Sequence, residues 1–113
     1  MRDDRVYLRH ILECLEAIAN YSAEGRASFL SDRKTQKATL RELQELAEST
    51  QRLSSELTSR HSEVPWSAIA GFRNVLVHDY LGLSLRRVWE VVERDLPALR
   101  AAVIDMLEEI ANQ

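Results

Sequence analysis

The spacing of apolar residues, together with the scarcity of glycine and proline, most constrains the fold of this chain. Apolar side chains recur every three or four residues over long stretches, which places them along one face of a helix. The 113 residues include only 3 glycines and 2 prolines, so few positions favour turns. The pattern therefore predicts an all-α chain built from long helices.

Three helical regions make up the first two thirds of the chain. Residues 3–22 form an amphipathic helix, and after a short turn in which Phe29 fills a gap in the core, residues 32–59 form a longer one. Pro65 suits the first position of a third helix, since its missing N–H would be unpaired there. This third helix, residues 66–79, is apolar nearly all round. We expect it to be buried on most sides, against other helices or a second subunit.

The last helical region contains the second proline. Ser84 is the expected N-cap of a helix that runs to about residue 111. Pro97 removes a backbone hydrogen bond and clashes with the preceding turn, so the helix should be kinked or split near residues 94–97. The sequence thus predicts a four- to five-helix bundle that forms a single domain over residues 1–113.

The charge balance and the single cysteine narrow the class of protein. The formal net charge is −3, from 15 basic and 18 acidic residues, which counts against indiscriminate capture of nucleic acid but allows a local basic cleft. With only Cys14 there is no disulfide framework. No apolar run is long enough to span a membrane, and the charged start does not resemble a secretory signal. We expect a cytoplasmic protein that does not contact a membrane.

Four polar residues close the third helix in the pattern R-N-x-x-x-H-x-Y. On an ideal helix, Arg73 and Tyr80 lie on nearly the same face, and Asn74 and His78 share another. Arg73 and His78 are separated by roughly 140° around the axis and ~7.5 Å along it. The long arginine side chain can close that gap within one chain, or an arginine of one subunit can meet the histidine of another.

These residue types suit the cleavage of RNA without a metal. Histidine titrates near neutrality, so His78 can take a proton from the 2′-OH and give one to the leaving oxygen. A guanidinium fork such as that of Arg73 stabilises charge on the phosphoryl oxygens. Asn74 can orient the imidazole ring or bind a phosphate oxygen, and Tyr80 can contact phosphate or stack on a base.

A purely structural role for the same residues is favoured by the pattern alone. A histidine at a helix end more often caps the helix or packs in the core, and an arginine in an apolar helix is often paired with an acid from a neighbouring helix. A metal site is not expected, because His10, His61 and His78 lack a tight ligand spacing and there is no cysteine cluster. The charged outer face of residues 32–59 is expected to be solvated.

The motif and its flanking segments resemble a known family. R-x4-H-x-Y at the end of an apolar helix, in a chain of this size, resembles the HepT-like branch of the HEPN proteins, ribonuclease toxins that are paired with minimal nucleotidyltransferases. The likeness covers nearly the whole chain, through residues 2–12, 47–50, 65–66, 69–74, 78–80 and 88–89.

The resemblance implies a fold, a reaction and partners. It implies a HEPN-type helical bundle that forms a homodimer, in which the two motif helices meet at a composite cleft. It implies an endoribonuclease without a cofactor that cleaves tRNA or mRNA, with Arg73 and His78 as the catalytic pair and Asn74 and Tyr80 positioning the substrate. It also implies a minimal nucleotidyltransferase antitoxin that transfers AMP to Tyr80. The alternative is a non-catalytic helical dimer that binds a nucleotide or a nucleotidyltransferase.

Overall fold

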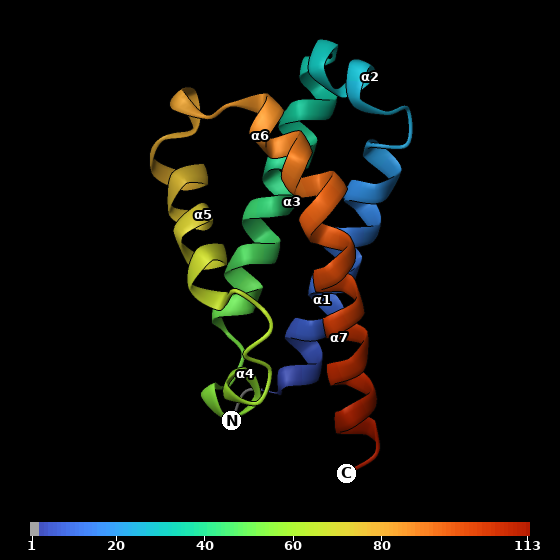
Figure 1. The fold of residues 1–113 in the computed structure, drawn as a ribbon, viewed down its shortest axis with the longest axis vertical. Coiled ribbons are helices and arrows are strands. Elements are labelled where there is room, and N and C mark those ends of the chain that lie inside the picture. Colours follow the sequence, from blue (N-terminus) through green and yellow to red (C-terminus); the bar gives the residue numbers. More distant parts are fainter. Residues whose placement is uncertain (1–2) are drawn as a thin grey trace.

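A computed structural model describes residues 3–113, except for the side chain of Tyr80. The described chain is all-α and elongated, with extents of 45 × 27 × 23 Å. Helices α1 and α3 pack side by side, with α5 against α3 and α7 against α1 (Figure 1). In chain order the elements are α1 (Asp4–Tyr21), α2 (Arg26–Ser31), α3 (Arg33–Gln51), α4 (Ser55–Ser59), α5 (Trp66–His78), η1 (Tyr80–Gly82), α6 (Leu85–Glu90), η2 (Val91–Asp95) and α7 (Leu96–Ala111).

Side-chain caps fix where the two central helices begin. The Asp3 carboxylate accepts a hydrogen bond from the Arg5 amide at 2.9 Å, which satisfies a free N–H at the start of α1. Asp32 caps α3 in the same way by accepting from the Lys34 amide at 3.1 Å. The predicted first helix is therefore confirmed to within one residue at each end.

Two predictions about the first half of the chain were wrong. The segment around Phe29, expected to be a turn, forms the short helix α2. The long helix expected over residues 32–59 ends at Gln51, and a new helix, α4, starts after Ser54. The Asp4 carboxylate accepts from the backbone amide of Ser54 at 2.8 Å and from its hydroxyl at 2.7 Å. This contact with the start of α1 holds Ser54 in an extended conformation, so the helix is interrupted there.

The last helical region is split near Pro97, as predicted. Between α6 and α7 lies the π-helical segment η2, in which the Leu96 amide donates to the Val91 carbonyl, five residues back. Pro97 follows as an early residue of α7 and has no N–H to donate to the turn before it. The wider π turn accommodates this missing hydrogen bond without ending the helical path.

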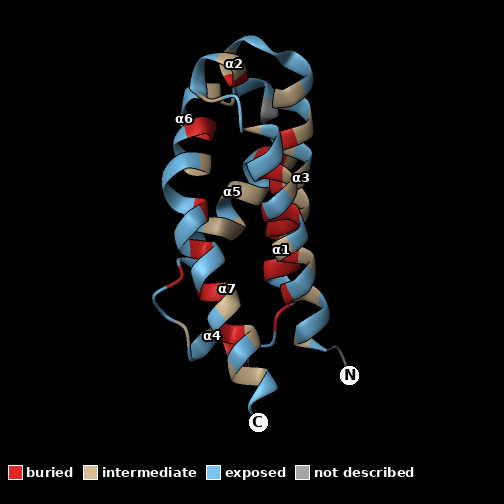
Figure 2. Cartoon of the chain, turned by 90° about the vertical axis from the view of Figure 1, so that its right-hand side faces the viewer, coloured by how far each residue is buried: buried red, intermediate tan, exposed pale blue. Residues whose placement is uncertain are grey.

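The core lies between α1, α3 and α7. Figure 2 shows buried residues along their facing sides, whereas most of α5 is exposed or intermediate. At the α2 end, Phe29 packs on Trp89 with ring centroids 5.5 Å apart, which closes the core there. Fully buried side chains of the three core helices include Leu8, Ile11, Ile18, Leu43, Val103 and Met106.

Helix α5 is less buried than its apolar sequence suggested. Among its residues only Leu76 is buried, and Val75 is 37% exposed. The expectation that this helix is covered on most sides is therefore wrong for one chain taken alone. Within residues 3–113, no helix is both long enough and apolar enough to cross a membrane.

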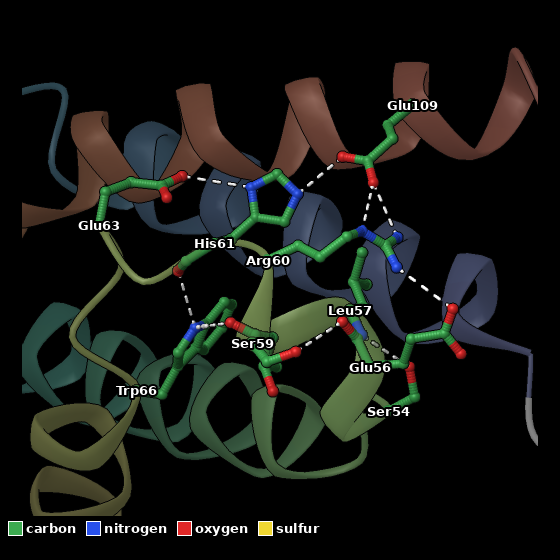
Figure 3. Close-up of polar contacts among 10 residues, drawn as sticks. Ser54, Glu56, Leu57, Ser59, Arg60, His61, Glu63, Trp66 and Glu109 are labelled. Atoms are coloured by element: carbon green, nitrogen blue, oxygen red, sulfur yellow. Dashed lines mark hydrogen bonds and ion pairs between the residues drawn. The ribbon is translucent and has the colours of Figure 1, made fainter.

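A polar network ties the loop before α5 to α7 (Figure 3). Glu109 of α7 lies 2.8 Å from His61 Nε2 and accepts from Arg60 Nη2 at 2.7 Å. His61 Nδ1 lies 3.2 Å from Glu63. The Trp66 indole N–H, at the start of α5, donates to the His61 carbonyl at 3.0 Å. This network fixes where α5 begins, and so fixes the motif helix relative to the core.

Candidate active site at the end of α5

Helix α5 carries the motif to its last turn and then stops. The Asp79 amide still donates to the Val75 carbonyl at 2.9 Å, but Asp79 has left helical geometry, with φ −146° and ψ 36°. The Gly82 amide then donates to the Asp79 carbonyl at 3.1 Å and closes a tight turn. A Cβ at Gly82 would lie 3.2 Å from the Asp79 carboxylate, so this turn fits glycine closely. His78 is therefore the final helical residue.

Arg73 is held between α5 and α3. Its Nη2 donates to Glu48 Oε1 at 3.4 Å, and its Nη1 donates to Asn74 Oδ1 at 3.3 Å. The side chain is 30% exposed, and its Nε is buried without a hydrogen-bond partner among the described residues. Arg73 is thus paired with an acid from a neighbouring helix, one of the two arrangements that the sequence suggested for it. The guanidinium group remains partly open to solvent.

The structure brings Arg73 and Asn74 together but leaves His78 apart from them. His78 and Asn74 are both exposed. Within residues 3–113, no hydrogen bond joins Arg73 to His78, so the arginine does not close the gap to the histidine of its own helix. The side chain of Tyr80 lies outside the described part of the structure. One chain therefore presents an anchored cation and, at the helix end, an exposed imidazole.

Glu48 is the residue near the motif whose contacts the sequence did not reveal. The outer face of α3 was expected to be solvated, yet Glu48 pairs with Arg73 and also accepts from Gln44 at 3.4 Å. On the same face, Glu45 accepts from Arg41 and lies 3.5 Å from His10. The presence of an arginine in an apolar helix was the signal that an acid must face it.

An open hollow lies beside this face of α3. Its volume is about 680 Å³, and Tyr7, His10, Glu48 and Arg52 contribute to its wall from α1 and α3 and from the residue that follows α3. Cys14 is buried nearby, and burial, together with Glu42, Glu45 and Glu13, raises the pKa of its thiol to about 12. The thiol is therefore protonated at neutral pH and is a poor nucleophile.

Comparison with known proteins identifies the family. Residues 11–106, from within α1 to within α7, match the HepT-like family, described as ribonuclease HepT-like. The chain belongs to the HepT-like ribonuclease family. The resemblance to the HepT-like proteins that was noted from the motif is thereby confirmed, and the all-α fold agrees with it.

Individual relatives agree with the HepT-like assignment. A "Probable ribonuclease HepT" of Thermococcus cleftensis is 34% identical over 100 residues, which cover 88% of this chain and 91% of that protein. A "Putative RNase" of Caldanaerobacter subterraneus subsp. tengcongensis is 34% identical over 110 residues, 96% of this chain and 98% of that protein. A protein of Methanocaldococcus jannaschii named "Gamma-glutamylcyclotransferase and putative RNase" is 31% identical over 110 residues, 96% of this chain. This HepT-like chain spans only 50% of that last relative. No solved structure matches this HepT-like chain.

Proposed function

We propose that this chain is a metal-independent endoribonuclease toxin that acts in the cytoplasm, with Arg73 and His78 as its catalytic pair. The observation that carries the proposal is the end of α5, where Arg73 is anchored by Glu48 while His78 is exposed at the last helical residue. Membership of a ribonuclease family supports RNA as the substrate. The overall acidic balance favours a selected tRNA or mRNA over indiscriminate binding.

The reaction follows from the two side chains. His78 removes the 2′-OH proton, and that oxygen attacks the adjacent phosphorus while the bond to the 5′ oxygen breaks. The protonated His78 then gives a proton to the leaving oxygen, which leaves a 2′,3′-cyclic phosphate and a 5′-hydroxyl. Arg73 stabilises the negative charge on the phosphoryl oxygens with a positive charge that is always present. Asn74 and Tyr80 position the substrate.

Two copies of the chain form the complete site in this proposal. Arg73 and His78 of one helix lie on different faces, so a second α5 lying across the first brings an arginine close to a partner histidine. The exposure of the apolar helix α5, with Val75 37% exposed, supports a homodimer that covers it. A second subunit was one of the two ways in which the sequence suggested that this helix is buried.

A minimal nucleotidyltransferase neutralises the toxin by transferring AMP from ATP to the hydroxyl of Tyr80, which breaks the bond between the α- and β-phosphates and releases pyrophosphate and the hydroxyl proton. Tyr80 begins η1, two residues after His78, the last residue of α5. A phosphate ester placed there brings negative charge to the part of the site that receives the RNA phosphate. The added phosphate then repels the RNA backbone. It also pairs with the Arg73 guanidinium, which should otherwise stabilise the transition state.

Cleavage of total tRNA and of a model mRNA in EDTA tests the proposal. We expect wild-type chain, shown by mass spectrometry to carry no AMP, to release fragments with cyclic-phosphate ends. His78→Ala should lose cleavage by about 10²–10⁴-fold, the usual contribution of general acid–base catalysis. Arg100→Ala, which removes an exposed surface arginine of α7, is the control and should cleave like wild type. Equal cleavage by His78→Ala, with its circular dichroism unchanged, would refute the assignment.

The Arg73–Glu48 pair also supports a second candidate, a non-catalytic dimer that binds a nucleotide or a nucleotidyltransferase. In that case Arg73 serves the packing of α5 on α3, as its hydrogen bond across the two helices suggests. Arg73→Ala would then abolish dimerisation and partner binding, and no RNA would be cut by the unmodified protein. Any cleavage that depends on His78 rules this candidate out.

A further inference from the structure

Three side chains with metal-binding atoms converge where α1 crosses α3. They are His10 and Cys14, one turn apart on α1, and Glu45 on α3, and their ligand atoms all lie within 4.8 Å of one another. We propose that these residues form a binding site for a zinc ion. The site uses neither Arg73 nor His78, so it goes beyond the proposed cleavage of RNA.

The distances between the ligand atoms fit tetrahedral zinc. His10 Nε2 lies 3.7 Å from Cys14 Sγ and 3.5 Å from Glu45 Oε1. Zinc bonds of about 2.0–2.3 Å, arranged tetrahedrally, give ligand-to-ligand separations of about 3.4–3.6 Å. Two of the three distances between ligand atoms are therefore already close to those around a bound zinc ion. Rotation of Glu45, whose side chain is 35% exposed, can bring its carboxylate oxygen to the required distance from Cys14 Sγ.

Both polar ligands are oriented by a further partner. His10 Nδ1 lies 2.6 Å from the Ser49 hydroxyl, and in the tautomer in which Nδ1 donates, Nε2 presents its lone pair to Cys14 and Glu45. The second oxygen of Glu45 accepts from Arg41 Nε at 3.0 Å. Outer hydrogen bonds of this kind fix the ring and the carboxylate of metal ligands in proteins.

The surroundings favour a cation and leave it a free coordination position. His10 and Glu45 also line the hollow of about 680 Å³ beside α3, so a water molecule from solvent can complete the tetrahedron. The hollow is lined by three carboxylates, Glu13, Glu45 and Glu48, against two arginines, Arg41 and Arg52, which leaves an excess of one negative charge. Binding replaces the S–H bond of Cys14 with a bond from sulfur to zinc, and the released proton leaves to solvent.

The donor set selects the metal. One thiolate, one imidazole and one carboxylate suit zinc, whereas magnesium and calcium require a shell of oxygens. Because Cys14 and Glu45 are 31 positions apart in the sequence and lie on different helices, a bound ion joins α1 to α3 directly. The folded chain should then be stabilised as free zinc rises above its dissociation constant.

Titration of the full-length chain with Co²⁺ and Zn²⁺ tests the site. We expect one equivalent of Co²⁺ to produce a thiolate-to-cobalt charge-transfer band in the near ultraviolet, and Zn²⁺ to remove it. Cys14→Ala should lose the band while keeping the fold, because alanine fills most of the same buried space. Ser49→Ala, which removes the partner of His10, should weaken binding about 10–100-fold.

A matched pair of charge variants separates coordination from general attraction. Glu45→Gln removes a ligand oxygen, and Glu13→Gln removes the same charge from the wall of the same hollow. Glu45→Gln should weaken Co²⁺ binding at least tenfold more than Glu13→Gln, whether or not Cys14→Ala folds. Absence of a charge-transfer band, or equal weakening by the two variants, would overturn the proposal. Cleavage assays in EDTA are unaffected by either result, so the two proposals fail separately.

Discussion

Arg73 donates a hydrogen bond to Glu48 across 3.4 Å and so joins the motif helix to the centre of the bundle. The Glu48 carboxylate accepts from Nη2 of the guanidinium, while Nη1 donates to the side-chain oxygen of Asn74. In the proposed ribonuclease, this arrangement would orient the cation before any substrate arrives, as a preorganised charge that lowers a transition-state barrier must be.

Glu48→Gln should lower the rate of RNA cleavage by about tenfold, a loss of about 1.4 kcal/mol of transition-state stabilisation. The stability of the fold should change by less than about 1 kcal/mol, because both side chains are partly exposed. Single-turnover cleavage and urea unfolding measure the two effects. Glu56→Gln, an exposed acid on α4, is the control. An unchanged rate would mean that Glu48 does not position Arg73.

The network around His61 should make stability depend on pH. Burial alone lowers the pKa of His61, but its contacts with Glu109 and Glu63 raise it above 6.5 overall. The contribution of His61 to the free energy of unfolding is therefore full below pH 6.5 and is lost as the pH rises through its raised pKa. Contacts with His61 and Arg60 lower the pKa of Glu109 below 4.5, so that contribution is present above pH 4.5 and is lost as the pH falls through the lowered value.

Thermal unfolding of wild type and His61→Gln, compared from pH 4 to pH 9, measures this dependence. The difference in Tm should be largest between the ordinary values of 4.5 and 6.5 and should shrink above that window. A difference that grows steadily toward alkaline pH would contradict the assignment of His61 as the cationic partner of Glu109.

Phe29→Ala should destabilise the chain by about 3–5 kcal/mol, since an aromatic ring that is 1% exposed is replaced by a cavity. The ring also loses its contact with Trp89. Urea unfolding followed by circular dichroism gives the free energy. Leu81→Ala, at a side chain 89% exposed, should change it by less than about 0.5 kcal/mol. Similar values for the two variants would show that α2 does not close the core.

Ser54→Ala should lower the free energy of unfolding by about 0.5–2 kcal/mol. The Ser54 hydroxyl caps α4 by accepting from the Leu57 amide, and it also donates to Asp4. Asp4→Asn should cost less in this background than in wild type, because the hydrogen bond from the Ser54 hydroxyl is already lost and the asparagine oxygen can still accept from the Ser54 amide. A double-mutant cycle measured by urea unfolding checks this coupling, with exposed Ser55→Ala as the control. Strictly additive losses would contradict it.

Local rules account for the parts of the fold that the sequence predicted. The apolar periodicity of α1, the helix start beside Pro65 and the split near Pro97 each depend on residues within a few positions. The end of α3 depends on Asp4, 50 residues away from Ser54, and could not be read from that stretch alone. The same limit applies to the site: the residue types of the motif were evident, but the pairing of Arg73 with Glu48 spans 25 residues.

The uncovered apolar side of α5 has a consequence for dosage. When two chains must associate to bring arginine and histidine together, the number of active pairs at low concentration rises with the square of the amount of protein. Halving the amount then removes about three quarters of the activity while single chains predominate. On the proposed function, a cell would thus tolerate a trace of the chain and be arrested only when synthesis outruns dilution by growth.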